Sequence, residues 1–84
     1  MIKISAAQVI PCKRQSISRI MDDKKQIGLL IVTRLQTGGY HVSTKVQAYD
    51  GRTVTVEQNL PETAKAEDCI QKAISAVKTV LMNF

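Results

Sequence analysis

Residues 40–58, YHVSTKVQAYDGRTVTVEQ, decide the fold because two alternating runs flank one Gly-containing turn. In each run, apolar and polar residues alternate, as in antiparallel strands with one wet face. A three-residue loop at 49–51 pairs Val46 with Val54 on one face, whereas a two-residue turn mixes the faces. Gly51 then takes the left-handed position of a type I turn with a G1 bulge. The stretch therefore predicts a bulged β-hairpin.

The preceding run, LLIVTRL at residues 29–35, has apolar residues in both of its alternating sets. This pattern is typical of a strand covered on two sides. A type I′ turn at 38–39 pairs Ile31 with Val46, and a turn at 37–38 keeps the same faces. Both alternatives therefore direct Ile31 toward the core.

This register has two consequences for the opposite face of the sheet. It leaves Leu30 and Val32 there, where we expect either the N-terminal segment or a second copy of the chain to cover them. It also predicts that Arg34, His41 and Lys45 share this outer face.

Residues 59–62 (NLPE) have the spacing of a capping box, and the sequence after them predicts a helix over about 60–82. Acidic residues lie near the start of this segment, as the helix dipole favours. Its apolar residues recur at intervals of three and four, which predicts one face packed on the sheet. The apolar stripe comprises Ala66, Ile70, Ala73, Ile74, Val77, Val80, Leu81 and Phe84.

The N-terminal segment leaves two alternatives open. Residues 1–5 alternate like an edge strand, and residues 16–25 suit either a short helix or a strand followed by a hairpin loop at 22–26. No repeat or linker divides the chain, so we expect residues 1–84 to form one domain. The predicted fold is α+β: a three-stranded antiparallel sheet over about 27–58 packed on the C-terminal helix, with an N-terminal strand, a short helix or both.

Composition limits the possible classes. With 84 residues, 44% of them apolar and no Trp, the core is thin, so a partner or a dimer can supply further burial. No apolar run is long enough to span a bilayer, and the first ten residues lack the features of a signal peptide, so we expect a cytoplasmic protein without a membrane partner. Cys12 and Cys69 are too few for a disulfide scaffold.

No sequence motif indicates catalysis. His41 is the only histidine, and nearly all of the seven carboxylates are explained by turns and by the helix start. The chain has no P-loop, dinucleotide-binding, CxxC or HExxH pattern. We therefore predict no enzyme activity, no catalytic residue, no metal site and no cofactor.

Positive charge is concentrated in the first part of the chain. The formal net charge is +5, and residues 1–52 hold nine of the twelve Lys and Arg residues. A basic face is a natural partner for a polyanion, so the leading hypothesis is a small accessory or regulatory module that binds DNA or RNA. The predicted nucleic-acid contacts are Lys13, Arg14, Arg19, Arg34, His41, Lys45 and Arg52. The alternative is a module that binds another protein, or itself, through the apolar strand 29–35 or its edge.

The sequence TGGYH at 37–41 is similar to the Gly-Pro-x-His loop between strands of double-stranded RNA-binding domains. An order of helix, three antiparallel strands and helix also looks like that family, and the resemblance implies duplex RNA as a ligand. The family has a Lys-rich start to its last helix. Here Lys65 stands among Glu62, Glu67 and Asp68, a departure that argues against duplex-RNA binding.

Overall fold

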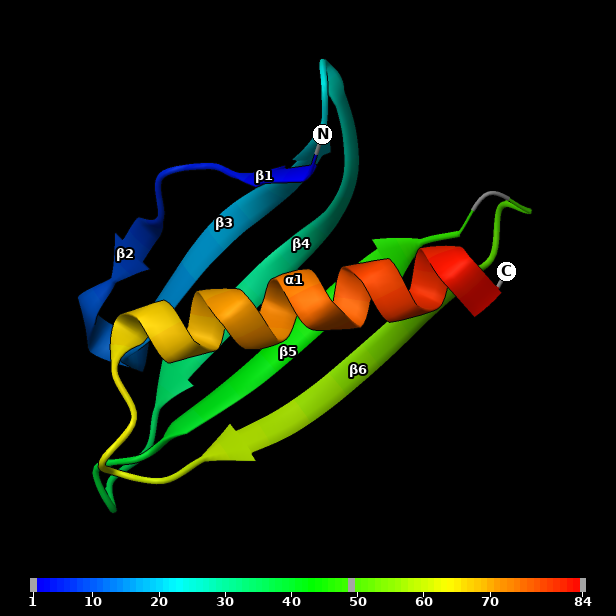
Figure 1. Cartoon of the computed structure of the whole chain (residues 1–84). Coiled ribbons are helices and arrows are strands. Elements are labelled where there is room, and N and C mark those ends of the chain that lie inside the picture. The colour runs from blue at the N-terminus through cyan, green and yellow to red at the C-terminus, as the bar shows by residue number, and fades with distance from the viewer. Residues whose placement is uncertain (1, 49, 84) are drawn as a thin grey trace.

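The computed structural model describes residues 2–48 and 50–83 as an antiparallel sheet with one helix, α1, across one face (Figure 1). The elements are β1 (Ile2–Ile4), β2 (Gln8–Ile10), the short 3₁₀ helix η1 (Pro11–Lys13), β3 (Gln15–Asp22), β4 (Lys25–Arg34), β5 (Tyr40–Gln47), β6 (Thr53–Leu60) and α1 (Ala66–Asn83). The strand order is β1-β3-β4-β5-β6, and β2 also pairs with β3. The α+β class is confirmed, but the prediction of three strands is an undercount because the six-stranded sheet includes the N-terminal segment.

The strand alternative is correct for the N-terminal segment. β3 and β4 form a tight hairpin in which Asp22 pairs with Lys25, and Asp23 takes a left-handed conformation with φ of 54°. The short helix predicted over 16–25 is wrong, since pairing with β4 gives this segment a two-residue period. Without that helix, the order seen in double-stranded RNA-binding domains is absent from the described residues. β1 is an edge strand as predicted, and Met1 lies outside the described residues.

The hairpin between β5 and β6 has the predicted register. Val46 pairs with Val54, and Thr44 pairs with Val56. Gly51 has φ of 91°, the left-handed conformation that the bulged turn requires. Tyr49, also in the predicted loop, lies outside the described residues.

The predicted register between β4 and β5 is wrong, because Ile31 pairs with Ser43 instead of Val46 and the faces of β4 are exchanged. Val32 pairs with Val42, and the loop at 36–38 is a second bulged turn in which Gly38 has φ of 98°. Gly39 serves packing instead of the turn, since a Cβ there would overlap the carbonyl oxygen of Leu60. The two glycines thus have different roles. The predicted type I′ turn is wrong because it assigned both of them to the turn.

This register determines which side chains face the helix. Leu30 is 1% exposed and lies in the core, whereas Ile31 points to the other face. The chain's own α1 packs on the face that contains Leu30, so neither the N-terminal segment nor a second copy is needed to bury it. The fully buried core side chains include Ile20, Leu30, Val42, Val46, Cys69 and Val77.

α1 begins at Ala66, later than the predicted start near residue 60. β6 continues to Leu60, which pairs with Tyr40, so strand pairing overrides the local capping signal at 59–62. The helix is capped instead by Asp68, whose Oδ2 accepts a 2.8 Å hydrogen bond from the backbone N–H of Lys65. Among the described residues, no helix is both long and apolar enough to cross a membrane. Phe84, the last residue of the predicted stripe, lies outside the described residues.

Candidate nucleic-acid interface

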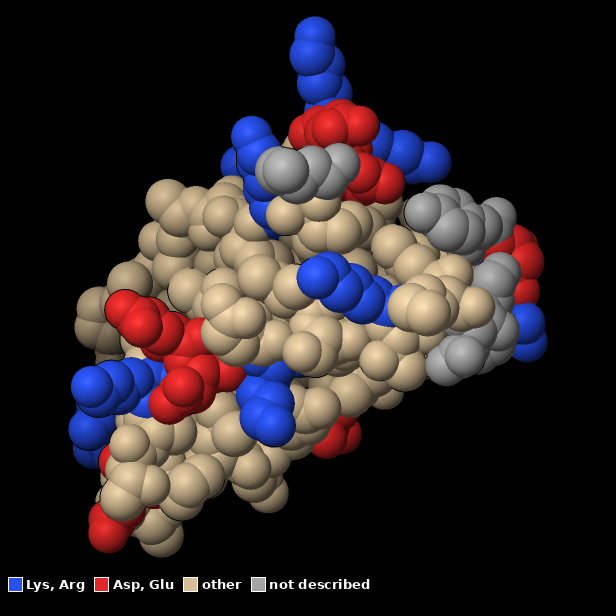
Figure 2. Space-filling view, viewed as in Figure 1, with Lys and Arg blue, Asp and Glu red and all other residues tan. Residues whose placement is uncertain are grey.

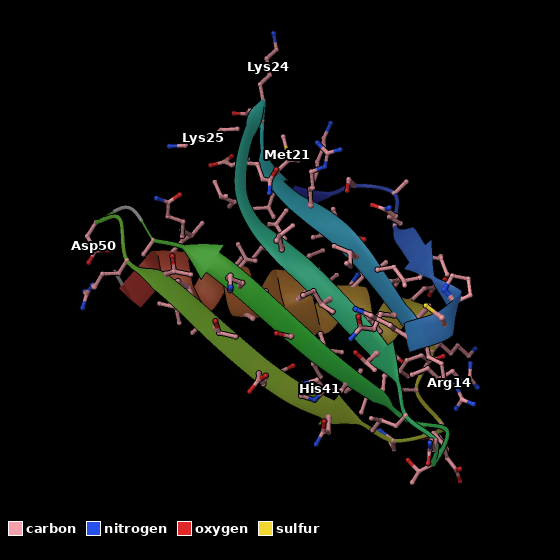
Figure 3. All side chains as sticks on the ribbon, turned by 180° about the vertical axis from the view of Figure 1, so that it is seen from behind. Arg14, Met21, Lys24, Lys25, His41 and Asp50 are labelled. Atoms are coloured by element: carbon pink, nitrogen blue, oxygen red, sulfur yellow. The ribbon has the colours of Figure 1, made fainter. Side chains whose placement is uncertain are left out.

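The sheet face opposite α1, which we call the open face, carries the candidate site. Figure 3 views this face directly, with α1 behind the sheet and no other described element in front of β4, β5 and β6. Outward side chains form three cross-strand rows, about 7 Å apart along the strands. The rows are Arg19, Leu29, Lys45 and Thr55; then Ile17, Ile31, Ser43 and Glu57; then Gln15, Thr33, His41 and Asn59.

The first row brings two cations together. Arg19 on β3 and Lys45 on β5 are the cross-strand partners of Leu29 on its two sides. Adjacent strands lie about 4.8 Å apart, so the two Cα atoms are about 10 Å apart. Both cationic side chains are exposed, while Leu29 is half-buried between them. The row therefore presents one long cationic side chain on each side of an apolar side chain.

Two shallow hollows meet at Leu29 and share Gln26. One, on the side of β3, has a volume of about 520 Å³, and the other, beside Lys45, has about 220 Å³. Apart from Arg19 and Lys45, the other lining residues are uncharged: Ser5, Ala6, Gln8, Ile17, Ile27, Gly28, Gln47 and Thr53. Amides and hydroxyls donate and accept hydrogen bonds, so these hollows suit a ligand with many polar groups.

Aliphatic side chains form a short strip on the open face. Ile17 and Ile31 are cross-strand partners, and Leu29 lies next to them in the first row. All three are half-buried. The sequence identified strand 29–35 as apolar on both sides, but only the correct register shows which of its side chains remain on the open face.

His41 is also on the open face, two rows from Lys45. Its Nδ1 lies 2.7 Å from Oδ1 of Asn59, and because an amide oxygen only accepts, Nδ1 is the donor. Its Nε2 lies 3.5 Å from a carboxylate oxygen of Glu57. The negative charge of Glu57 makes this end of the face less favourable for a phosphate than the end with Arg19 and Lys45.

Arg34 lies on the other side of the sheet, so the prediction that it shares a face with His41 and Lys45 is wrong. It pairs with Tyr40, while its neighbour Thr33 pairs with His41. The Arg34 guanidinium lies 5.5 Å from the Tyr40 ring centroid and donates a 3.4 Å hydrogen bond to the Tyr40 hydroxyl. The wrong register between β4 and β5 is the cause, because the observed pairing places the even-numbered residues of β4 on the helix side.

Lys13 and Arg14 belong to the same end of the sheet as Arg34. Lys13 ends η1, and Arg14 follows in a left-handed conformation with φ of 53°. The carbonyl oxygen of Arg14 accepts a 2.8 Å hydrogen bond from the backbone N–H of Arg34. Figure 3 shows Arg14 at the far end of the sheet from Asp50.

Arg52 is in the turn between β5 and β6, where it interacts with Asp50. The Arg52 backbone N–H donates to Oδ1 of Asp50 at 3.0 Å, and its Nε donates to Oδ2. The backbone hydrogen bond, followed by the guanidinium contact, holds the pKa of Asp50 below its ordinary value. The charge of Arg52 is thus partly neutralised within its own turn. The seven predicted residues therefore lie in three places: the open face, the end of the sheet around Arg14 and Arg34, and the turn between β5 and β6.

The helix side of the molecule has mixed charge. Figure 2 shows basic and acidic side chains next to one another near the β3–β4 turn and near the start of α1, with a further basic group over α1 and otherwise mostly uncharged surface between them. Lys24 and Lys25 directly follow Asp22 and Asp23 in that turn. A polyanion approaching from this side meets both signs of charge, which favours the open face as its binding surface.

The described residues offer little for metal or thiol chemistry. They contain no group of three or more His, Cys, Asp and Glu side chains arranged to hold a metal ion. Cys12 is exposed, whereas Cys69 is buried in the core. Burial, reinforced by the charge of Asp68, raises the pKa of the Cys69 thiol. This thiol is therefore less reactive than an exposed one.

Comparison with known proteins gives no match to any family model, curated protein or solved structure.

Proposed function

We propose that this chain is a non-enzymatic module that binds single-stranded nucleic acid, DNA or RNA, across its open face. The observation that carries the proposal is the cross-strand row in which Arg19 and Lys45 flank Leu29. The two cations supply phosphate contacts, which dominate affinity for nucleic acids. The surrounding amides and hydroxyls supply positioning contacts.

A single strand fits this face better than a duplex. Leu29 separates the two cations, and together with Ile17 and Ile31 in the next row it offers an apolar surface to unstacked bases. A duplex exposes mainly phosphates and groove edges, so the strip would contact charged or hydrated groups. None of the three side chains is aromatic, so phosphate contacts supply most of the affinity and binding depends strongly on salt.

Fluorescence anisotropy with labelled single-stranded oligonucleotides tests this proposal. Each phosphate contact on a single strand contributes about 0.7 to the slope of log K against log salt concentration. Lys45→Gln therefore lowers the slope by about 0.7 and weakens binding by roughly eightfold at 50 mM salt. Arg19→Gln has a similar effect, and the double variant loses about 1.4 of slope.

Lys72→Gln is the matched control, since Lys72 is exposed on α1 and its loss changes the net charge equally. It should leave the salt slope unchanged. The proposal is refuted if no single strand is retained at low salt, or if Lys72→Gln weakens binding as much as Lys45→Gln. Stronger retention of duplexes than of single strands would refute the choice of ligand.

A second candidate function is protein docking on the same aliphatic strip. β4 is paired with β3 on one edge and with β5 on the other, so its edge is occupied and only outward side chains such as Leu29 and Ile31 remain accessible. Ile31→Lys distinguishes the two functions. It removes one apolar contact to the bases but adds a cation to the open face, so it preserves the salt slope of nucleic-acid binding, whereas it abolishes docking on the strip.

A further inference from the structure

The two edges of the sheet are very different. At one edge β1 and β2 have three residues each, are separated by residues 5–7, and are followed by Pro11. Short, interrupted strands with a nearby proline are common devices that prevent edge-to-edge association. At the other edge, β6 runs for eight residues from Thr53 to Leu60 without a proline or a lysine.

The hydrogen-bond phase of β6 shows which backbone groups face outward. In the turn between β5 and β6, the Ala48 N–H donates a hydrogen bond to the carbonyl oxygen of Arg52. Because backbone hydrogen bonds alternate along an antiparallel strand, the even-numbered residues of β6 bond to β5. The N–H and C=O groups of the odd-numbered residues therefore point away from β5, where the sheet ends. The odd-numbered residues are Thr53, Thr55, Glu57 and Asn59.

The helix side of β6 is only partly covered. Val54, Val56 and Leu60 pack against the core but remain half-buried. The reason is that α1 packs mainly across β5, with less contact to β6. Figure 1 shows the same arrangement, with β6 at the margin of the sheet. An open backbone edge therefore lies beside incompletely buried apolar side chains.

We propose that β6 pairs in antiparallel fashion with β6 of a second copy of this chain. The facing of the side chains and the backbone hydrogen bonding place the same requirement on this pairing. Apolar side chains stay on the helix side only when odd-numbered residues pair with odd-numbered residues. Hydrogen bonding has the same requirement, because the odd-numbered residues are those whose backbone groups point away from β5 at this edge and bond to no other described residue. Two copies of β6 can therefore pair with each other while the apolar side chains of both stay on the helix side.

Charge selects the register. Two registers give the greatest overlap, one with Val56 opposite the partner's Val56 and the other with Glu57 opposite the partner's Glu57. The second places two carboxylates directly opposite each other, which is destabilising. The first places Glu57 opposite the partner's Thr55 and puts the two-fold axis at Val56. It forms about eight hydrogen bonds and joins the two open faces into one continuous surface.

Disulfide cross-linking tests the register in a Cys12→Ser background. Val56 lies on the axis in a non-hydrogen-bonded pair, so the two Cα atoms are about 4.5 Å apart, within disulfide range. The Cα atoms of the two Val54 residues are about 14 Å apart, too far for a bond. Val56→Cys should give a covalent dimer on oxidation and Val54→Cys should not. Cross-linking through Val54→Cys instead would overturn the register.

A pair of variants at Thr55 tests the association itself. Thr55→Glu faces the partner's Glu57 twice per dimer and should weaken the dimer roughly fivefold, while Thr55→Lys should strengthen it by a similar factor. Within one chain Thr55 pairs with Lys45, so the glutamate favours the monomer's fold and the lysine opposes it. Weaker association of Thr55→Glu therefore cannot result from unfolding.

Sedimentation equilibrium at low salt measures both constants, with 9.3 kDa expected for the monomer and twice that mass for the dimer. The proposal predicts a concentration-dependent dimer and a roughly 25-fold difference between the two variants. A single 9.3 kDa species at every concentration, or equal constants for the variants, would overturn it. Arg19 and Lys45 are not part of the β6 edge, so failure of this proposal leaves the nucleic-acid proposal standing.

Discussion

Gly28→Ala tests the strand packing that underlies the open face. Gly28 lies in β4 between Ile20 of β3 and Val46 of β5. A Cβ at this position would overlap the carbonyl oxygen of Lys45 and lie 3.1 Å from its carbonyl carbon and 3.2 Å from Cα of Val46. All these obstacles are backbone atoms, so no side-chain rotation relieves the clash.

The expected cost follows from this geometry. Relief requires β4 and β5 to separate by roughly 1 Å, and overpacking of this kind costs about 1–3 kcal/mol or more. The separation also weakens one or two ladder hydrogen bonds, at about 1 kcal/mol each. We therefore expect a loss of roughly 3–5 kcal/mol, a large part of the roughly 4–12 kcal/mol typical of an 84-residue domain.

Urea unfolding followed by far-ultraviolet circular dichroism measures this loss, with Gly51→Ala as the control. A Cβ at Gly51 meets nothing within 4 Å, so its cost comes only from φ of 91° and is about 1–2 kcal/mol. Gly28→Ala should be clearly the more destabilising of the two. If it unfolds at the same urea concentration as the wild type, or later than Gly51→Ala, the description of β4 and β5 packing is wrong.

Two further predictions test the register and the core. Leu30→Lys should unfold the chain, because it buries a charge at a position that is 1% exposed, whereas Ile31→Lys on the open face should keep its circular dichroism spectrum. Equal tolerance of both changes would contradict the assignment of faces. Cys12 should react quickly with a thiol reagent and Cys69 slowly, since burial raises the pKa of Cys69 and leaves less thiolate at neutral pH. Unfolding in urea should make the two thiols react alike, and a fast native reaction of both would show that the α1 core is open.

Short-range sequence signals are sufficient to predict the hairpin between β5 and β6. The position of Gly51 and the strict alternation around it allow only one register that keeps Val46 and Val54 on the same face. The register of the hairpin between β4 and β5 is harder to predict, because either of two adjacent glycines, Gly38 and Gly39, could belong to the turn. The sequence does not reveal that Gly39 is required by the approach of the Leu60 carbonyl, a contact with a strand 21 residues away.

That single error explains the misplaced site residue. The wrong register places Arg34 on the open face and Leu30 away from the helix, whereas the structure places both on the helix side. Arg19 and Lys45 were both predicted as contacts, but their common row depends on the pairing of β3 with β4. The spacing of apolar residues in 16–25 suited a helix as well as a strand, so the sequence alone did not bring Arg19 and Lys45 together.

Binding of nucleic acid to the open face can be observed residue by residue in an NMR titration of the ¹⁵N-labelled chain with a short single-stranded oligonucleotide at low salt. We expect the amide shifts to concentrate at Arg19, Leu29 and Lys45 and to decline toward Glu57, while the exposed side of α1 stays unchanged. Shifts confined to the end of the sheet around Arg14, or to α1, would refute binding at the open face, as would an unchanged spectrum.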